Sequence, residues 1–465
     1  MIPRSFRALS SCLVGLGLAG LAGCSNSSHD PKLAKQEASE AIPNVPVPAE
    51  GNPPIASIAD MTVVLERPAP GARVLGYLHA GSRVARANEP YSRKDCPGGW
   101  YPVRPIGFVC AGEAATIDPR HPTLLAMAIQ PSLDQPLPYT FARTRVDTPL
   151  YEREPRQDAA VREVGKLRKR AGMAVVGSWT ASMPGGAPER FALLTSGKFV
   201  RAADLEAAES TSFSGALLDK DVKLPLAWVV KRGVRAWKLD GTFVKKHDLL
   251  DYHARLELTG RFRTVDGEKY WAVSDGRWVR HKDVTLALPR SKFPDFAKEG
   301  VKWIDLSIIT SVLIAYEGKQ PILATLASVA RPIEGDPGLV SAEVIPAAAV
   351  ARPADTAAKP SPNALGTFEV RAKHVTLVGA NPREQGESYE LYDVPWVLEL
   401  SSGRKLYGAY WHDRFGVEHG GGNVELAPAD AQRLFSWVTP ALPSGFHGFS
   451  PAQIKDGTTY VVLRK

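Results

Sequence analysis

Short apolar stretches separated by turn residues recur along most of the chain and favour a mainly β fold. In the first such region, Thr62–Glu66 and Val74–Leu78 alternate with turns such as Pro68–Gly71, at spacings of about ten residues. Strands of this length at this spacing are typical of small barrels and sandwiches. Of the 465 residues, 44% are hydrophobic and 23% are charged, which predicts a globular protein of several domains and excludes wholesale disorder.

The N-terminal residues have the organisation of an export signal. Two arginines precede an apolar stretch over residues 8–22, which is too short to span a membrane. Its ending, Leu21-Ala22-Gly23-Cys24, resembles the lipobox of bacterial lipoproteins, in which the cysteine receives a diacylglycerol and becomes the first residue after cleavage. We expect a signal peptide over residues 1–23 and a lipid anchor on Cys24 in the bacterial cell envelope, at an outer membrane and facing the periplasm. A plain signal peptide cut near Ala22 is the alternative.

The segment after the expected lipidation site has a different composition. Residues 24–58 are rich in Pro, Ala, Ser and charged residues and have little apolar pattern. Such segments do not bury enough apolar surface to fold. We expect a flexible tether between the lipid and the folded part of the chain.

Two cysteines remain in the chain after the expected lipidation site. Cys96 and Cys110 are separated by a turn and a strand pattern. Cysteines of exported proteins usually pair, so we expect a disulfide between them. A pair of reactive thiols is the alternative, but it lacks a nearby histidine to activate either thiol.

Three stretches upstream of residue 290 resemble bacterial SH3-like domains. In residues 60–115 the similarity rests on Gly99-Trp100-Tyr101-Pro102-Val103 and Gly107-Phe108-Val109. A closing phrase recurs at Gly197–Leu205 and at Gly276–Val284, where glycine, an aromatic residue, Val-Arg, Asp and an aliphatic residue have the same offsets. We expect tandem SH3-like barrels at residues 60–115, 140–208 and 222–288. Alternatively, the last two are halves of one irregular β domain.

The last part of the chain combines strand patterns with one helical pattern. Strand patterns include Val301–Leu306, Val312–Tyr316 and Leu406–Trp411, and Pro428–Val438 has apolar residues on one helical face. Residues 331–363 are Ala- and Pro-rich and are expected to be a low-complexity insertion within the domain. We expect a β-sandwich with one short helix over residues 293–465.

Several phrases of this region resemble the L,D-transpeptidase family, also called the YkuD-like domain. They occur in the family's order: Trp303-Ile304-Asp305, Leu365-Gly366-Thr367-Phe368, Asp393-Val394-Pro395-Trp396, Gly408-Ala409-Tyr410-Trp411-His412-Asp413 and Ala427-Pro428-Ala429-Asp430-Ala431. The resemblance implies an L,D-transpeptidase-like β-sandwich and a role in peptidoglycan remodelling. In the family, a Cys thiolate activated by a His attacks a carbonyl of a stem peptide, and the acyl-enzyme passes to an amine.

The chain departs from that family at its catalytic motif. The flanking phrases fix a gapless alignment in which the family's Ser-His-Gly-Cys falls on Gly420-Gly421-Gly422-Asn423 and its upstream His-Gly falls on Tyr407-Gly408. Asn423 therefore replaces the nucleophile, Gly421 replaces the His of the motif and Tyr407 replaces the upstream His. No Cys occurs in residues 111–465. We expect no catalytic residue at these degenerate positions.

The sequence leaves three functions open. The preferred one is a catalytically inactive envelope lipoprotein that binds peptidoglycan stem peptides or a partner cell-wall enzyme, and the alternatives are an active transpeptidase or carboxypeptidase with an unrecognised nucleophile and a structural envelope protein. The candidate binding residues near the old motif are Asn423, Tyr407, His412, Trp411 and His419. No cofactor or metal is expected, because the acidic residues and histidines lack ligand spacing. The chain has a net charge of +8, but its basic residues are spread along the sequence and form no long run. No nucleic-acid partner is therefore expected.

Overall fold

The structure is a computed structural model that describes residues 42–153, 160–182, 186–240, 243–329, 365–379, 383–384, 387–418, 423–451 and 457–465. Contacts divide the chain into Met1–Asn44 and Val45–Lys465, and the fold below concerns the second unit. The expected signal peptide, Cys24, most of the tether and the 331–363 insertion lie outside the described residues. None of the described helices is both long and apolar enough to cross a membrane.

The first module is built from seven short strands. They form two sheets, in the orders β4-β1-β7 and β3-β2-β6-β5. Ile55, Val64, Leu78 and Val109 lie in its buried core. The strands are β1 (Pro54–Ser57), β2 (Thr62–Leu65), β3 (Val74–Leu78), β4 (Arg83–Ala85), β5 (Trp100–Pro102), β6 (Phe108–Cys110) and β7 (Ala115–Thr116).

Strand β1 corrects the expected end of the tether. Residues 54–57 were expected to belong to the flexible segment, but they pair with β4 and β7. Ile55 is fully buried in the core of the module. The prolines around Ile55 do not favour a strand, so the sequence pattern did not predict β1. The burial of Ile55 and the pairing with two neighbouring strands stabilise it.

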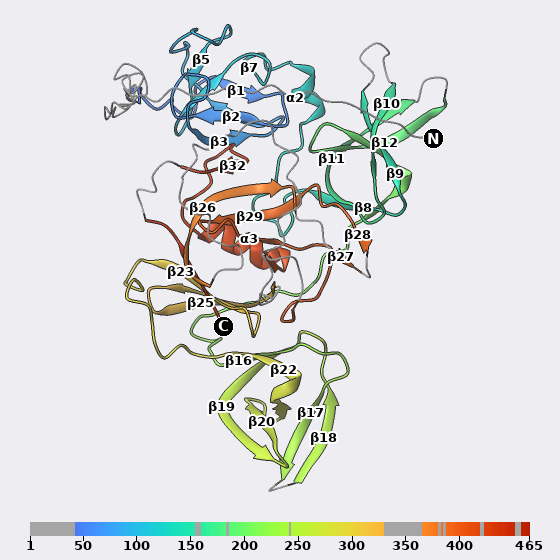
Figure 1. The fold of residues 1–465 in the computed structure, drawn as a ribbon, viewed down its shortest axis with the longest axis vertical. Coiled ribbons are helices and arrows are strands. Elements are labelled where there is room, and N and C mark those ends of the chain that lie inside the picture. Colours follow the sequence, from blue (N-terminus) through green and yellow to red (C-terminus); the bar gives the residue numbers. More distant parts are fainter. Residues whose placement is uncertain are drawn as a thin grey trace, which may run out of the picture. The chain divides into compact units, whose positions relative to one another are not determined.

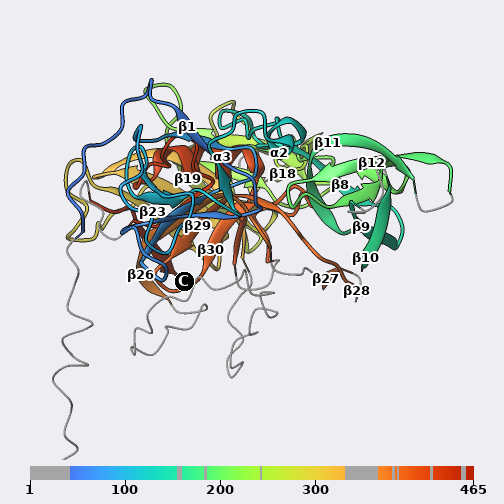
Figure 2. The same ribbon diagram turned by 90° about the horizontal axis from the view of Figure 1, so that it is seen from above.

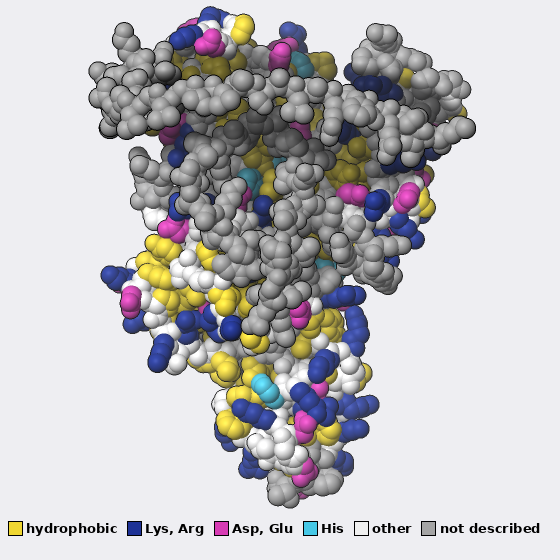
Figure 3. All heavy atoms as spheres, viewed as in Figure 1, with side chains coloured by type: hydrophobic (Ala, Val, Ile, Leu, Met, Phe, Trp, Pro, Cys, Tyr) yellow, Lys and Arg dark blue, Asp and Glu magenta, His cyan; other side chains and the backbone are white. Residues whose placement is uncertain are grey.

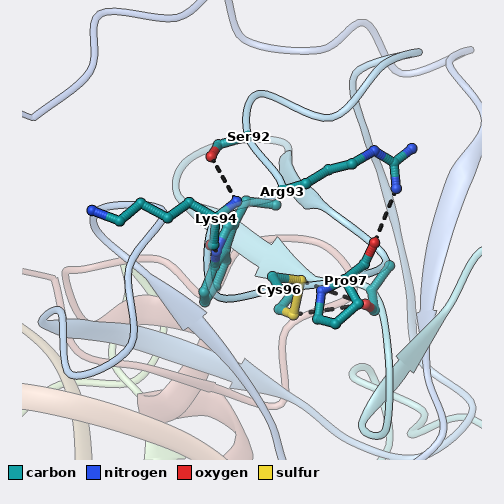
Figure 4. Close-up of a disulfide and its surroundings, with 8 residues drawn as sticks. Ser92, Arg93, Lys94, Cys96 and Pro97 are labelled. Carbon is teal, nitrogen blue, oxygen red and sulfur yellow. Dashed lines mark hydrogen bonds between the residues drawn. A yellow bond between two sulfur atoms is a disulfide. The ribbon is translucent and has the colours of Figure 1, made fainter.

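The expected disulfide is present in the first module. It links Cys96 and Cys110, whose Cα atoms are 5.9 Å apart. Cys110 lies opposite Trp100 at the end of the β5–β6 ladder, whereas Cys96 lies in the loop before β5. Figure 4 shows this loop, in which the Arg93 guanidinium donates a hydrogen bond to the Pro97 carbonyl (3.0 Å). The disulfide therefore joins this loop to strand β6.

The second and third modules each contain seven strands of their own. The second comprises β8 (Thr140–Thr144), β9 (Thr148–Arg153), β10 (Val161–Leu167), β11 (Gly172–Ser182), β12 (Pro188–Leu194), β13 (Phe199–Arg201) and β14 (Leu205–Ala207). The third comprises β16 (Leu226–Val229), β17 (Arg235–Asp240), β18 (Phe243–Leu249), β19 (Arg255–Val265), β20 (Glu268–Val273), β21 (Trp278–Arg280) and β22 (Val284–Ala287). The strands of the second module lie together in both ribbon views (Figures 1 and 2).

All three modules share one strand order. When the strands of each are numbered one to seven along the chain, the second and third sheets both run 3-2-6-5-4-1-7. The first module has the same order, divided between strands five and four into its two sheets. The second and third stretches therefore have the same topology.

The repeated closing phrase occupies the same place in both of these units. Gly197 and Gly276 have φ angles of +73° and +86°, a backbone conformation that favours glycine. Each precedes a short strand and then a 3-10 turn, Ala202–Asp204 in one unit and His281–Asp283 in the other. The recurrence in the sequence thus marks a recurring turn.

The C-terminal domain is a ring of paired strands around a buried core. The ladders follow the order β29-β30-β31-β25-β24-β23-β33-β26, and β26 also pairs with β29. The principal strands are β23 (Lys302–Ser307), β24 (Val312–Glu317), β25 (Gln320–Val329), β26 (Gly366–Leu377), β29 (Val394–Leu400), β30 (Lys405–Gly408), β31 (Val424–Leu426) and β33 (Tyr460–Arg464). Shorter strands are β15 (Ala216–Leu217), β27 (Arg383–Glu384), β28 (Glu387–Ser388) and β32 (Gly448–Phe449).

The helical pattern of the C-terminal domain is confirmed. Helix α3 (Pro428–Trp437) ends one residue before the expected limit and packs against β29 and β30 (Figure 1). Its buried face includes Ala431, Leu434 and Phe435. A second described helix, α2 (Pro122–Ala126), is only five residues long and lies between the first two modules in the sequence. The mainly β fold class is confirmed.

Candidate functional site

The positions that match the family's catalytic motif meet where β30 and β31 run in parallel. Tyr407 is opposite Glu425 in this ladder, and Asn423 immediately precedes β31. Two of the three degenerate positions, Tyr407 and Asn423, therefore lie close together in the fold. The third, Gly421, lies outside the described residues, as does His419.

The Asn423 side chain is committed to the backbone. Its amide oxygen accepts a hydrogen bond from the backbone N–H of Lys405, the first residue of β30 (3.0 Å). This contact ties the start of β31 to the start of β30. An amide nitrogen has no available lone pair for attack on a carbonyl, so Asn423 contributes a structural hydrogen bond and no nucleophile.

Tyr407 is buried and remains protonated. Its side chain is only 2% exposed. Burial raises the pKa of its hydroxyl well above the ordinary value, and the Glu425 carboxylate adds to this rise. The Asn423 side chain opposes part of this rise in the pKa. A phenol with a raised pKa is a poor base at neutral pH, so Tyr407 does not replace the family's upstream His.

His412 and Glu425 form a buried pair beside Tyr407. The His412 Nε2 atom lies 2.9 Å from the Glu425 carboxylate, and their side chains are only 6% and 4% exposed. The other ring nitrogen, Nδ1, accepts a hydrogen bond from the backbone N–H of Arg414 (3.0 Å). In the neutral ring the hydrogen is therefore on Nε2, from which it is donated to Glu425. Both nitrogens are engaged within the protein, and neither is free to activate a nucleophile.

Sequence reasoning overlooked Glu425. The residue follows Val424 and precedes Leu426 on a strand whose three residues are all buried. A carboxylate in such a strand needs partners, because burial of an unpaired charge is costly. Its placement between two apolar residues of a strand was the available signal. Together, Tyr407, His412, Asn423 and Glu425 form what we call the polar cluster.

Trp411 is packed inside the domain. Its side chain is 6% exposed and meets the rings of Tyr410 and His412 edge-on, with centroid distances of 5.1 and 5.8 Å. The ring faces are therefore covered by the protein itself. The expectation that Trp411 stacks on a ligand does not fit this placement, because such stacking needs an accessible ring face.

Two acidic residues within the family-like phrases hold separate parts of the chain together. The Asp393 carboxylate accepts hydrogen bonds from the backbone N–H of Ala174 (3.0 Å) and the hydroxyl of Thr195 (3.0 Å). The Asp430 carboxylate accepts hydrogen bonds from the Gly215 N–H (2.8 Å) and from the Thr325 hydroxyl. Burial raises the pKa of both acids, while these hydrogen bonds oppose the rise. These residues thus have structural roles.

The chemistry available to the polar cluster is limited. It contains no thiol or activated hydroxyl, and its carboxylate is paired with His412. Across the described ranges, no three His, Cys, Asp or Glu side chains are arranged to hold a metal ion. The described residues of the cluster therefore provide hydrogen bonds and no covalent chemistry.

Comparisons with known proteins give similarity only at the level of structure. No family model and no curated protein matches the chain. An L,D-transpeptidase from Mycobacterium smegmatis is 13% identical over 54% of this chain and 100% of that chain, with a TM-score of 0.23. L,D-transpeptidase 3 from Mycobacterium tuberculosis is 16% identical over 45% and 79%, with a TM-score of 0.23. An Enterococcus faecium L,D-transpeptidase is 14% identical over 38% and 54%, with a TM-score of 0.21. Similarity at this level establishes neither a family nor an activity for this chain.

Proposed function

We propose that this chain is a peptidoglycan-binding lipoprotein of the bacterial cell envelope with a catalytically inactive L,D-transpeptidase-like domain. The family-like phrases in their order support the peptidoglycan context. The observation that carries the inactivity is the state of the motif positions: Asn423 bonds to the backbone, and Tyr407 is a buried phenol. Neither residue supplies the nucleophile or the base that acyl transfer needs.

The polar cluster supports the proposed inactivity. In a working site of this kind, the nucleophile and base are accessible to the substrate. Here, Tyr407, His412 and Glu425 are buried, and His412 is paired with Glu425. The side chains have become part of the packing between β30 and β31. The proposed noncovalent role at the wall does not depend on these buried side chains and rests on the family-like phrases.

Acylation of the purified full chain tests the inactivity. A carbapenem, which acylates the family's Cys, should leave the intact mass unchanged, and a tetrapeptide donor should give no acyl adduct. Asn423→Cys alone should also remain unacylated, because Tyr407 cannot act as its base and Gly421 carries no side chain. The combination of Asn423→Cys, Gly421→His and Tyr407→His is the control in which chemistry has its best chance. An adduct on the unchanged chain would overturn the proposal in favour of an unrecognised nucleophile.

Sedimentation with isolated peptidoglycan tests the binding. The full chain should pellet with peptidoglycan sacculi and be displaced by soluble stem peptides. A chain that stays in the supernatant at physiological salt would refute peptidoglycan binding and favour a purely structural role in the envelope.

A further inference from the structure

The positive charge of the chain is concentrated in its modules, above all in the third. Residues 222–288 contain fourteen Lys and Arg and eight Asp and Glu, a formal net charge of +6 with His neutral. Residues 293–465 contain sixteen basic and nineteen acidic residues, a net charge of −3. Figure 3 shows Lys and Arg side chains gathered over the part formed by β16–β22, lowest in that view. An anionic partner is therefore attracted to this module more strongly than to the C-terminal domain.

One side of the third module's sheet combines cations with aromatic rings. Residues directly opposite each other in antiparallel strands point to the same side of the sheet, as do alternate residues along a strand. The register of β17, β18, β19, β20 and β21 places six basic or aromatic residues on one side, together with Glu268, whose carboxylate is paired with Lys282. We call this set the basic–aromatic face: Trp237, Lys246, Arg263, Tyr270, Trp278 and Arg280.

The contacts on this face order both the rings and the cations. The Arg280 guanidinium carbon lies 5.0 Å from the centroid of Trp237, and that of Arg263 lies 5.9 Å from Trp278. Arg280 is also held by Asp283, at 2.7 Å. Lys246 and Arg263 are exposed and form no ion pair with any described residue. Cation–π contact orients a guanidinium while leaving its outer donors available.

The other side of the same ladder adds to the excess charge at a cost in stability. Lys238 and Lys245 are opposite each other, and both side chains are exposed. Like charges directly opposite each other destabilise a sheet. Charge complementarity therefore favours a partner with many negative charges.

We infer that the third module binds an anionic polysaccharide through the basic–aromatic face. Guanidinium and ammonium groups bind the carboxylates or phosphates of such a polymer, and partly exposed indole rings pack against the apolar edges of its sugars. Trp237 and Trp278 are only half-buried, but each has a guanidinium over its ring. The indole rings therefore add only apolar contact, and the choice of a sugar chain over a nucleic acid rests on the proposed envelope location of the chain.

The test measures binding of the full chain to immobilised polygalacturonate, with uncharged dextran of the same length as the control polymer. We expect binding to polygalacturonate that weakens between 50 and 500 mM salt, and no binding to dextran. The salt range is chosen because screening shortens the reach of exposed charges. The variant Lys246→Gln/Arg263→Gln should lower the affinity at least fivefold.

A matched variant on the opposite side of the sheet distinguishes binding at the basic–aromatic face from attraction by the overall charge of the module. Lys238→Gln/Lys245→Gln removes the same charge from the same module and should lower the affinity less than twofold. Equal losses in the two double variants would overturn the inference, as would tighter binding to oligothymidylate of equal charge or to anionic vesicles. Neither result alters the acylation test, so this inference and the proposed function can fail separately.

Discussion

Asn423 illustrates how tertiary contacts define the part that a single residue plays in the candidate site. At this position the similar family has a nucleophile, whereas here the amide oxygen accepts a hydrogen bond from Lys405. The residue therefore ties the start of β31 to the start of β30. The two ring nitrogens of His412 are likewise bonded within the protein, to Glu425 and to the Arg414 backbone. Residue identity alone suggested ligand contact at both positions, but the tertiary contacts that engage them are invisible in the sequence.

A buried lysine gives a pH-dependent prediction at the same scale. Lys373 is 1% exposed, donates a hydrogen bond to the Val438 carbonyl (3.2 Å) and lies 4.6 Å from the Phe435 ring centroid. Burial, with repulsion from Lys302, lowers the pKa of Lys373 from 10.5 to about 7. Between these two values the unfolded chain binds more protons at this residue than the folded chain. The free energy of unfolding should therefore rise with pH from about 7 towards 10.5, by up to about 1.4 kcal/mol per pH unit.

The Lys373→Met variant should abolish this rise. Urea unfolding at pH 6.5 and 9.5, followed by tryptophan fluorescence, measures the free energy of unfolding. The difference between variant and parent is compared at the two pH values. The variant should gain most at the lower pH, where the parent carries a buried ammonium. The exposed Lys298→Met variant is the control and should show the same pH dependence as the parent. A parallel response of Lys373→Met and parent would contradict the lowered pKa.

Sequence patterns predicted helices and strands correctly where the apolar residues of the pattern are the ones buried in the fold. The helix over 428–438 was predicted because Pro428 starts it and apolar residues share one face, and α3 follows that prediction closely. Strand β1 was missed because prolines and polar residues surround Ile55. The pairing of β26 with β29, which closes the ring of strands, depends on contacts distant in the sequence and has no local signal.

The disulfide gives a prediction at the scale of one element. Cys96 and Cys110 are separated by 14 positions, and closing a loop of about 15 residues stabilises a fold by roughly 3 kcal/mol. The Cys96→Ala/Cys110→Ala variant should lose about that much in urea unfolding of the full chain. The parent after reduction is the matched control and should lose a similar amount. Labelling of both thiols in the unfolded, unreduced parent would show that the bridge does not form.

At the scale of the whole chain, the modules and the C-terminal domain differ in charge and in topology. Three modules repeat one strand order, and the third of them carries a net charge of +6. The C-terminal domain carries −3 and contains the polar cluster. In the linear sequence the basic residues form no long run, and the pairing of β17 to β21 gathers several of them on one face. Function at this scale could be predicted only in part, because register decides which side chains share a surface.

The lipid anchor is the prediction that concerns the molecule as a whole. A diacylglycerol on Cys24 would hold the chain at the membrane through buried methylene groups, each contributing about 0.8 kcal/mol. The basic third module offers a second, electrostatic route to an anionic envelope, which high salt screens. Membranes washed in high salt should therefore retain the parent and release Cys24→Ser into the soluble fraction. Cys12→Ser, which alters only the expected signal peptide, is the matched control and should stay with the membranes. Retention of Cys24→Ser after the wash would show that the chain is held by something other than this cysteine.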